Sequence, residues 1–120
     1  MKAIHPADQA MAKRHLDNTT HWNVSGKKHS VHSRSLGNAI HWALDDARNG
    51  TGIHELGKAG PYTMEADVDN GKVKGIFLRL RGNRYKVDLD RQAIAGNNAG
   101  GHILDSIKRA MRSIAGKDDE

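Results

Sequence analysis

The stretch from residue 62 to residue 89, YTMEADVDNGKVKGIFLRLRGNRYKVDL, decides the expected fold. Apolar and polar residues alternate from Tyr62 to Val68, and this period of two predicts a half-buried strand. Asp69-Asn70-Gly71 is a strong hairpin signal, and Gly82-Asn83 is a second turn signal. The stretch therefore predicts an antiparallel meander of three strands, which run from Tyr62 to Val68, from Lys72 to Arg81 and from Arg84 to Asp90.

The register of the first hairpin can be predicted from its two faces. A two-residue Asn70-Gly71 loop would mix apolar and charged side chains on both faces, whereas register normally keeps one face apolar. We therefore expect a three-residue loop, Asp69-Asn70-Gly71, or an equivalent bulge near Gly75. Either arrangement places the following residues on one apolar face: Tyr62, Met64, Ala66, Val68, Ile76, Leu78, Leu80, Tyr85, Val87 and Leu89.

The opposite face of the meander is expected to be charged. With a two-residue Gly82-Asn83 loop, Arg81 lies opposite Arg84, and Arg79 lies opposite Lys86. Like charges that face each other across strands destabilise a sheet. Either carboxylates on the same face or an anionic partner must therefore neutralise the patch, and the expected members of this face are Thr63, Glu65, Asp67, Val73, Phe77, Arg79, Arg81, Arg84, Lys86 and Asp88.

Helical patterns flank the meander. They run from His5 to Asp17, from Ser35 to about Ala47, where Asn49-Gly50 provides a stop signal, and from His102 to Ala115. Residues 18–34 and 51–61 are polar or rich in glycine and are predicted to be loops, and residues 96–101 are predicted to be a flexible link. The chain is thus predicted to be α+β, with N-terminal helices, a three-stranded antiparallel β-meander and a C-terminal helix packed on one sheet face.

Length and composition limit the class of protein. A chain of 120 residues fits one small domain, 1–120. Its N-terminal helix and polar loop, 1–34, are expected to be mobile unless a partner or an ion holds them, and the tail 116–120 is expected to fray. The absence of cysteine excludes disulfides and thiolate metal sites. No apolar run approaches about 18 residues, and the start MKAIHP lacks the apolar region of a secretory signal, so we expect a cytoplasmic protein with no membrane association.

The basic charge indicates an anionic partner. The net charge is +5 and the pI is near 9.7, which favours nucleic acid or an acidic protein surface. An exposed aromatic residue among arginines and lysines is typical of sheet surfaces that bind RNA or single strands. Our leading interpretation is therefore a small nucleic-acid-binding domain, with Phe77, Arg79, Arg81, Arg84, Lys86, Lys27, Lys28 and Arg34 as candidate binding residues.

Two further functions stay open. The first is a metal-independent ribonuclease, which needs an acid, a base and cations around the phosphate; the candidate residues are His29, His32, His54, Glu55 and Lys58. A helical segment followed by a meander with Arg and His resembles the layout of small bacterial toxin ribonucleases. The second is a small phage-type or plasmid-type inhibitor or adaptor that binds an acidic protein surface.

Other sites and cofactors are not predicted. His29 and His32 are spaced as two metal ligands could be, but no third ligand is evident, so we predict no metal. The chain has no P-loop, no dinucleotide fingerprint and no zinc-protease motif, so we predict no cofactor. The order helix, three strands, helix resembles double-stranded RNA-binding domains in topology alone, since the last helix opens with the sequence GGHILD and lacks a basic start.

Overall fold

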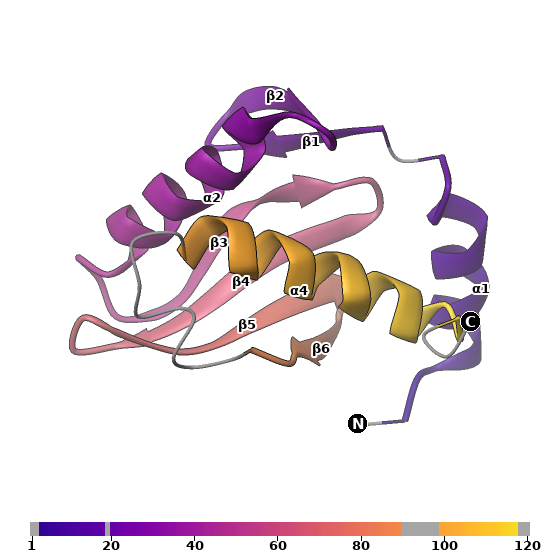
Figure 1. Ribbon diagram of the computed structural model, residues 1–120. Coiled ribbons are helices and arrows are strands. Elements are labelled where there is room, and N and C mark those ends of the chain that lie inside the picture. Colours follow the sequence, from indigo (N-terminus) through magenta and orange to yellow (C-terminus); the bar gives the residue numbers. More distant parts are fainter. Residues whose placement is uncertain (1–2, 19, 90–98, 118–120) are drawn as a thin grey trace.

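The computed structural model describes residues 3–18, 20–89 and 99–117. It is an α+β fold in which the described residues form three helices and a six-stranded antiparallel sheet (Figure 1). The strand order in the sheet is β2-β1-β3-β4-β5-β6. The elements are α1 (Pro6–His15), β1 (His21–Val24), β2 (Lys27–Ser30), α2 (Arg34–Ala47), β3 (Gly52–Ala59), β4 (Tyr62–Asp69), β5 (Lys72–Leu80), β6 (Asn83–Val87) and α4 (Ala99–Ile114).

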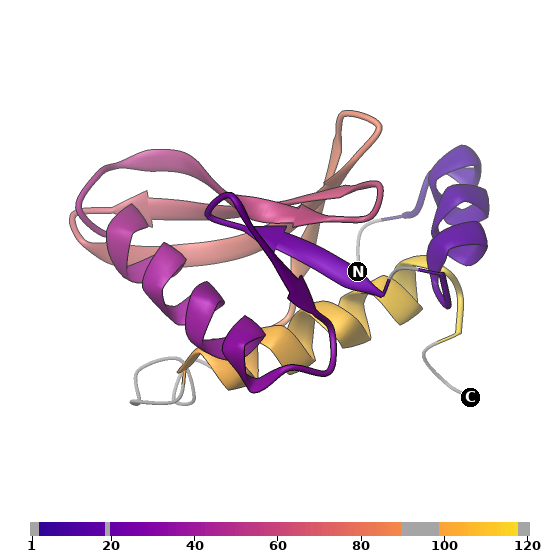
Figure 2. The same cartoon turned by 90° about the horizontal axis from the view of Figure 1, so that it is seen from above.

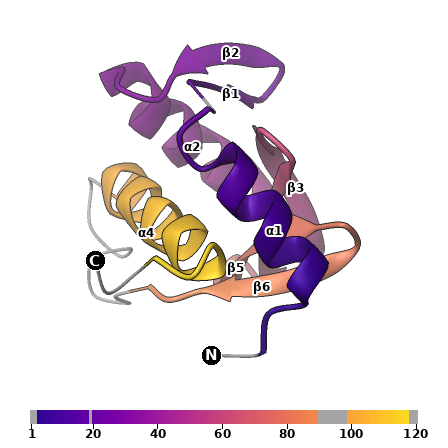
Figure 3. The same cartoon turned by 90° about the vertical axis from the view of Figure 1, so that its right-hand side faces the viewer.

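The helices are distributed unevenly around the sheet. Helices α2 and α4 lie on the same face, and α1 lies at the end of the sheet next to the turn between β5 and β6 (Figures 2 and 3). None of the three described helices covers the opposite face, which we call the helix-free face. The core lies between α2, α4 and the sheet, and its fully buried side chains include Leu36, Ile40, Leu44, Ile103, Ile107, Ile114, Met64, Ile76, Leu78 and Leu80.

The predicted meander is present as β4, β5 and β6. Its first hairpin has a two-residue loop, Asn70-Gly71, with φ of 51° and 79°, so the predicted three-residue loop is wrong. The alternative, a bulge near Gly75, is confirmed: Gly75 pairs with Asp67, Val73 pairs with Val68, and Lys74 is the extra residue. Because this bulge shifts the register, the predicted apolar face is kept, and its members are buried except for Leu89, which is partly buried.

The second hairpin differs from the prediction by two residues. Its turn residues are Arg81 and Gly82, with φ of 51° and 83°, and Leu80 pairs with Asn83. Arg79 therefore lies opposite Arg84, and the predicted pair of Arg81 with Arg84 is wrong. A shift of two residues preserves which side chains share a face. It moves Arg81 into the turn, where a neighbouring carboxylate from α1 binds its side chain.

Both predicted loops before the meander contain strands. Residues 18–34 hold the hairpin of β1 and β2, and residues 51–61 hold β3, so the predicted order of two helices, three strands and a helix lacks three strands. In β1, the alternation is too short to be recognised from the sequence, although Trp22 is buried on the helix side. In β3, Gly57 allows a close approach of β1, because an added Cβ would lie 2.3 Å from the carbonyl oxygen of Asn23.

Two helix starts also differ from the prediction. Helix α2 begins at Arg34, one residue before the predicted start at Ser35, and Ser33 caps it, since the Ser35 amide donates to Ser33 Oγ at 3.1 Å. Helix α4 begins at Ala99, so the last part of the predicted flexible link is helical, while residues 96–98 lie outside the described residues. Gly100 allows α4 to touch α2, because an added Cβ would lie 2.1 Å from the Gly37 carbonyl oxygen. Residues 118–120 of the predicted frayed tail also lie outside the described residues.

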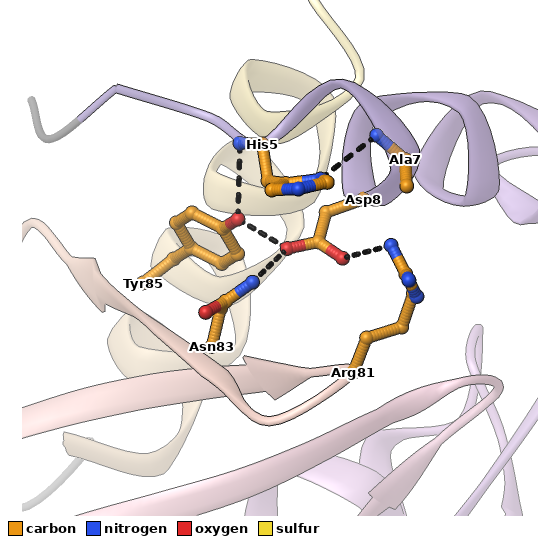
Figure 4. A network of polar contacts seen from close by, with 6 residues as sticks. All are labelled: His5, Ala7, Asp8, Arg81, Asn83 and Tyr85. Atoms are coloured by element: carbon orange, nitrogen blue, oxygen red, sulfur yellow. Dashed lines mark hydrogen bonds and ion pairs between the residues drawn. The ribbon is translucent and has the colours of Figure 1, made fainter.

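A buried carboxylate fixes α1 to the sheet (Figure 4). The Asp8 side chain is 0% exposed; it accepts hydrogen bonds from Tyr85 Oη and, at 2.7 Å, from Asn83 Nδ2, and it pairs with Arg81 at 3.4 Å. Burial alone raises the pKa of Asp8, but these hydrogen bonds and the charge of Arg81 outweigh it, so the pKa lies below its ordinary value of 3.8. Since α1 otherwise buries little apolar surface, this group of residues, which we call the Asp8 clamp, positions the helix.

Candidate nucleic-acid interface

A single row of residues crosses the helix-free face from one edge of the sheet to the other. The pairing register aligns Lys28 of β2 with Asn23 of β1, then with Lys58, Thr63, Arg79 and Arg84 of the following four strands. Each strand contributes one side chain, four of the six are cations and none is an anion. We call this set the cationic row. It joins residues that are far apart in the sequence, and three of them, Asn23, Lys28 and Lys58, come from segments that were predicted to be loops.

A second row of residues on the helix-free face contains the aromatic residue Phe77. Glu55, Glu65, Phe77 and Lys86 are aligned in register across β3, β4, β5 and β6. Phe77 is partly exposed, and its ring lies beside Gly75, where an added Cβ would be 3.5 Å from the ring edge. The Lys86 side chain also approaches Gly75, because the same added Cβ would lie 3.8 Å from Lys86 Cε. Phe77 therefore covers the glycine and keeps part of its surface accessible.

One buried carboxylate explains how two arginines face each other across β5 and β6. Glu65 is only 3% exposed, and its carboxylate accepts from Arg84 Nε at 2.8 Å and pairs with Arg79 Nη1 at 3.1 Å. The hydrogen bond and the charge of Glu65 raise the pKa of Arg84 above its ordinary value. The repulsion predicted from the sequence is thus relieved inside the protein, partly by Glu65 and, for Arg81, by Asp8.

The internal pairing does not cancel the charge of the helix-free face. Glu65 carries one negative charge and contacts two guanidinium groups, whose side chains are 39% and 45% exposed. Among the described residues, no carboxylate forms an ion pair with Lys28, Lys58 or Lys86. By register, the face holds five cations (Lys28, Lys58, Arg79, Arg84 and Lys86) and three carboxylates (Glu55, Glu65 and Asp67), so its net charge is positive.

Three of the predicted binding residues lie elsewhere. Arg81 is in the turn and contacts Asp8. Lys27 pairs with Val24, which places it on the helix side of β2, and Arg34 is the first residue of α2. The structure therefore brings together Lys28, Phe77, Arg79, Arg84 and Lys86 from the predicted set, and it adds Lys58.

The predicted catalytic residues do not form one cluster. Glu55 and Lys58 lie on the helix-free face, whereas His54 pairs with Ala66 on the helix side and its Nε2 lies 3.1 Å from the Thr51 carbonyl oxygen. His29 pairs with Trp22, also on the helix side, and its Nδ1 lies 3.1 Å from Ser35 Oγ, while His32 follows β2 and is exposed. Within residues 3–18, 20–89 and 99–117, no group of three or more His, Asp or Glu side chains is placed to hold a metal ion.

Sequence reasoning missed the cationic row because it depends on pairings between distant segments. Lys58 was a candidate only for catalysis, and Asn23 and Thr63 had no assigned role. Without the positions of β1 and β3, nothing in the local sequence places Lys28 and Lys58 in line with Arg79 and Arg84. The alternation around Trp22 was the one local signal for the missing strand β1.

Comparisons of the chain with protein-family models, with curated proteins and with solved structures found no match. No helix in the described parts of the chain is long and apolar enough to cross a membrane. Function must therefore be argued from the site itself.

Proposed function

We propose that the chain is a small domain that binds RNA or single-stranded nucleic acid on the helix-free face. The observation that supports this proposal is the cationic row. At about 4.8 Å between neighbouring strands, six strands extend the row over about 24 Å. At about 3.4 Å per nucleotide along a strand, this length matches about seven nucleotides, within the range of about 4–16 nucleotides that single-strand-binding folds cover.

The lysines, the arginines and the aromatic residue on this face would each contribute a different contact to binding. Exposed Lys28, Lys58 and Lys86 provide mobile positive charge for phosphates. The guanidinium groups of Arg79 and Arg84 are held in place by Glu65, so less side-chain freedom is lost when their remaining N–H groups donate to phosphate oxygens. Phe77, directly opposite Lys86, offers an aromatic surface on which a base can stack.

The buried carboxylate of Glu65 determines which substitutions can test nucleic-acid binding without destabilising the fold. Replacing Arg79 and Arg84 together would leave Glu65 buried without a partner, and an uncompensated buried charge destabilises a fold. Replacing the exposed lysines avoids this problem. The test variant is therefore Lys28→Gln/Lys58→Gln/Lys86→Gln. The matched control, Lys13→Gln/Arg14→Gln/Arg109→Gln, removes the same charge from exposed positions on α1 and α4.

The experiment is a titration of a labelled single-stranded RNA of mixed sequence, followed by fluorescence anisotropy, with thermal melts to show that every variant is folded. We expect the test variant to bind at least about tenfold more weakly than the wild type, a loss of about 1.4 kcal/mol. The control variant should keep the wild-type affinity. Equal weakening in both variants would mean that only the net charge matters, and it would count against a site on the helix-free face.

The same samples separate the two other functions. Cleavage of the RNA by clean protein in the presence of EDTA would point to a metal-independent ribonuclease. Absence of any nucleic-acid affinity, together with a defined protein that co-purifies with the chain, would point to an inhibitor or adaptor.

A further inference from the structure

A pocket of about 250 Å³ opens on the helix side of the molecule, away from the cationic row. It lies where the end of α1, strand β1, the segment after β2, the start of β4 and the second half of α4 meet. We call it the α1–α4 pocket. Its polar lining consists of His15, Asp17, His32, Tyr62, Lys108 and Arg112. Three neighbouring parts of the N-terminal segment thus meet β4 and α4, which are distant in the sequence, at one concavity.

The charge of this lining favours an anion. Lys108 and Arg112 are one helical turn apart on α4, so both side chains reach the same side of the helix. Lys108 Nζ donates to the Val31 carbonyl oxygen at 3.1 Å, and this bond fixes the ammonium group at the pocket while its other protons remain available. The exposed His32 adds a ring N–H donor to the lining. Asp17 is the one carboxylate in the lining.

A buried hydroxyl belongs to one residue of the pocket wall. Tyr62 is only 4% exposed, and its hydroxyl has no hydrogen-bond partner among the described residues. A buried polar group without a partner is unfavourable, so such groups are normally satisfied by water or by a ligand. Burial, together with the charge of Asp8, raises the pKa of Tyr62 to about 12. The hydroxyl therefore stays protonated and can donate a hydrogen bond.

The remaining walls of the pocket are apolar. Leu16, Trp22 and Met111 line it beside the polar groups. With about 30 Å³ for each water molecule, the volume is too large for an inorganic ion alone, and it lies just below the range of about 300–1,000 Å³ typical of drug-sized ligands. The pocket therefore suits a small molecule with one anionic end and one apolar or aromatic end.

We propose that the α1–α4 pocket binds the phosphate group of a small organic phosphate monoester. A phosphate monoester has three terminal oxygens, so it can accept hydrogen bonds from Lys108 and Arg112 together and keep one oxygen for a further donor, whereas a carboxylate has two oxygens. Its oxygens can also accept from a ring N–H of His32, which is exposed and lines the pocket. The apolar walls then contact the organic part. The same chemistry could be supplied by a free metabolite or by the phosphorylated end of a nucleic-acid strand.

The test uses the full chain with Trp42→Phe. Trp42 is 64% exposed on α2, and its replacement leaves Trp22, in the pocket wall, as the single fluorescent reporter. The probes are phenyl phosphate, phenol as the uncharged counterpart, and a dinucleotide with either a 5′-phosphate or a 5′-hydroxyl. In this background, Lys108→Met/Arg112→Gln removes two pocket cations, and Lys13→Gln/Arg109→Gln removes two exposed cations outside the pocket lining.

We expect saturable quenching or enhancement of Trp22 fluorescence by phenyl phosphate but not by phenol. The pocket variant should weaken binding at least about tenfold, as expected for the loss of charge-assisted hydrogen bonds, while the control variant binds normally. Amide chemical shifts in NMR spectra verify that each variant is folded. Tighter binding of the 5′-phosphorylated dinucleotide than of phenyl phosphate would identify a nucleic-acid end as the ligand, and the reverse would identify a free monoester.

Absence of a saturable response to both phosphorylated probes at millimolar concentrations would overturn the proposal. Equal weakening in the pocket variant and the control variant would overturn it too. The outcome is separate from that of the proposed nucleic-acid interface, because Lys28→Gln/Lys58→Gln/Lys86→Gln leaves the pocket intact and should bind phenyl phosphate with unchanged affinity.

Discussion

Replacement of Asp8 by alanine should be among the most damaging single substitutions outside the apolar core. Asp8 accepts hydrogen bonds from Tyr85 and Asn83 and pairs with Arg81. Hydrogen bonds to a charged group contribute about 1.5–3 kcal/mol each. The pair with Arg81, whose side chain is 44% exposed, adds at most about 1 kcal/mol. Allowing for overlap among these contacts, we expect a loss of about 3–5 kcal/mol in the free energy of unfolding, as observed when one partner of a buried charge pair is removed.

Urea denaturation followed by far-UV circular dichroism measures this loss. The total stability of a domain is about 5–15 kcal/mol, so Asp8→Ala should lower the urea midpoint markedly. The control is Asp45→Ala, which removes a surface pair with Arg48 at 3.9 Å and should change the stability by less than about 0.5 kcal/mol. A loss below about 1 kcal/mol in Asp8→Ala would refute the role of the Asp8 clamp in holding α1.

Three further predictions follow from individual contacts. Because the pKa of Asp8 is lowered in the folded state, Asp8 contributes its full stabilisation above the unfolded pKa near 3.8 and loses it as the pH falls through the folded pKa. Urea titrations from pH 5 downward should show this loss in the wild type and not in Asp8→Asn. Tyr62→Phe removes a hydroxyl without a partner among the described residues and should leave the free energy of unfolding unchanged or raise it by about 1 kcal/mol. Tyr85→Phe removes a donor to Asp8 and should lower the free energy of unfolding by about 1.5–3 kcal/mol. Equal effects of the two substitutions in thermal melts would contradict this contrast. Gly100→Ala should destabilise the contact between α2 and α4. Gly101→Ala, with no atom within 4 Å of the added Cβ, should stabilise α4 by about 1 kcal/mol. Calorimetry of both variants measures the difference between them.

The apolar face of the meander could be predicted because it depends on local patterns. The alternation from Tyr62 to Val68, and the requirement that one face stay apolar, were enough to predict a register shift of one residue, although not to choose between a three-residue loop and the bulge near Gly75 that the structure has. The turn at Arg81-Gly82 could not be predicted in the same way. Its position depends on Asp8, a residue more than seventy positions away, which binds both Arg81 and Asn83.

The missing strands have a different cause. Strand β3 contains Gly52 and Gly57, and strand β1 contains four residues, so neither has a strong local signal. Gly57 is required by the close approach of β1, which is a tertiary contact. The cationic row could not be found without these strands, and the α1–α4 pocket could not be found because Tyr62, Lys108 and Arg112 meet only in three dimensions. The charge of the meander was visible in the sequence, but the relief of its repulsion by buried Glu65 was not.

The dependence of RNA affinity on salt tests the central claim most directly. Of the three carboxylates on the helix-free face, Glu65 is the one with a recorded ion pair among the described residues, so the five cations leave about four charges for phosphates. At about 0.7 per phosphate, the slope of log Kobs against log salt should be about −3 for a single strand. Removing three of these charges in Lys28→Gln/Lys58→Gln/Lys86→Gln should bring the slope to about −1, while Lys13→Gln/Arg14→Gln/Arg109→Gln keeps it near −3. A wild-type slope near zero, or the same slope in both variants, would contradict a nucleic-acid interface on this face.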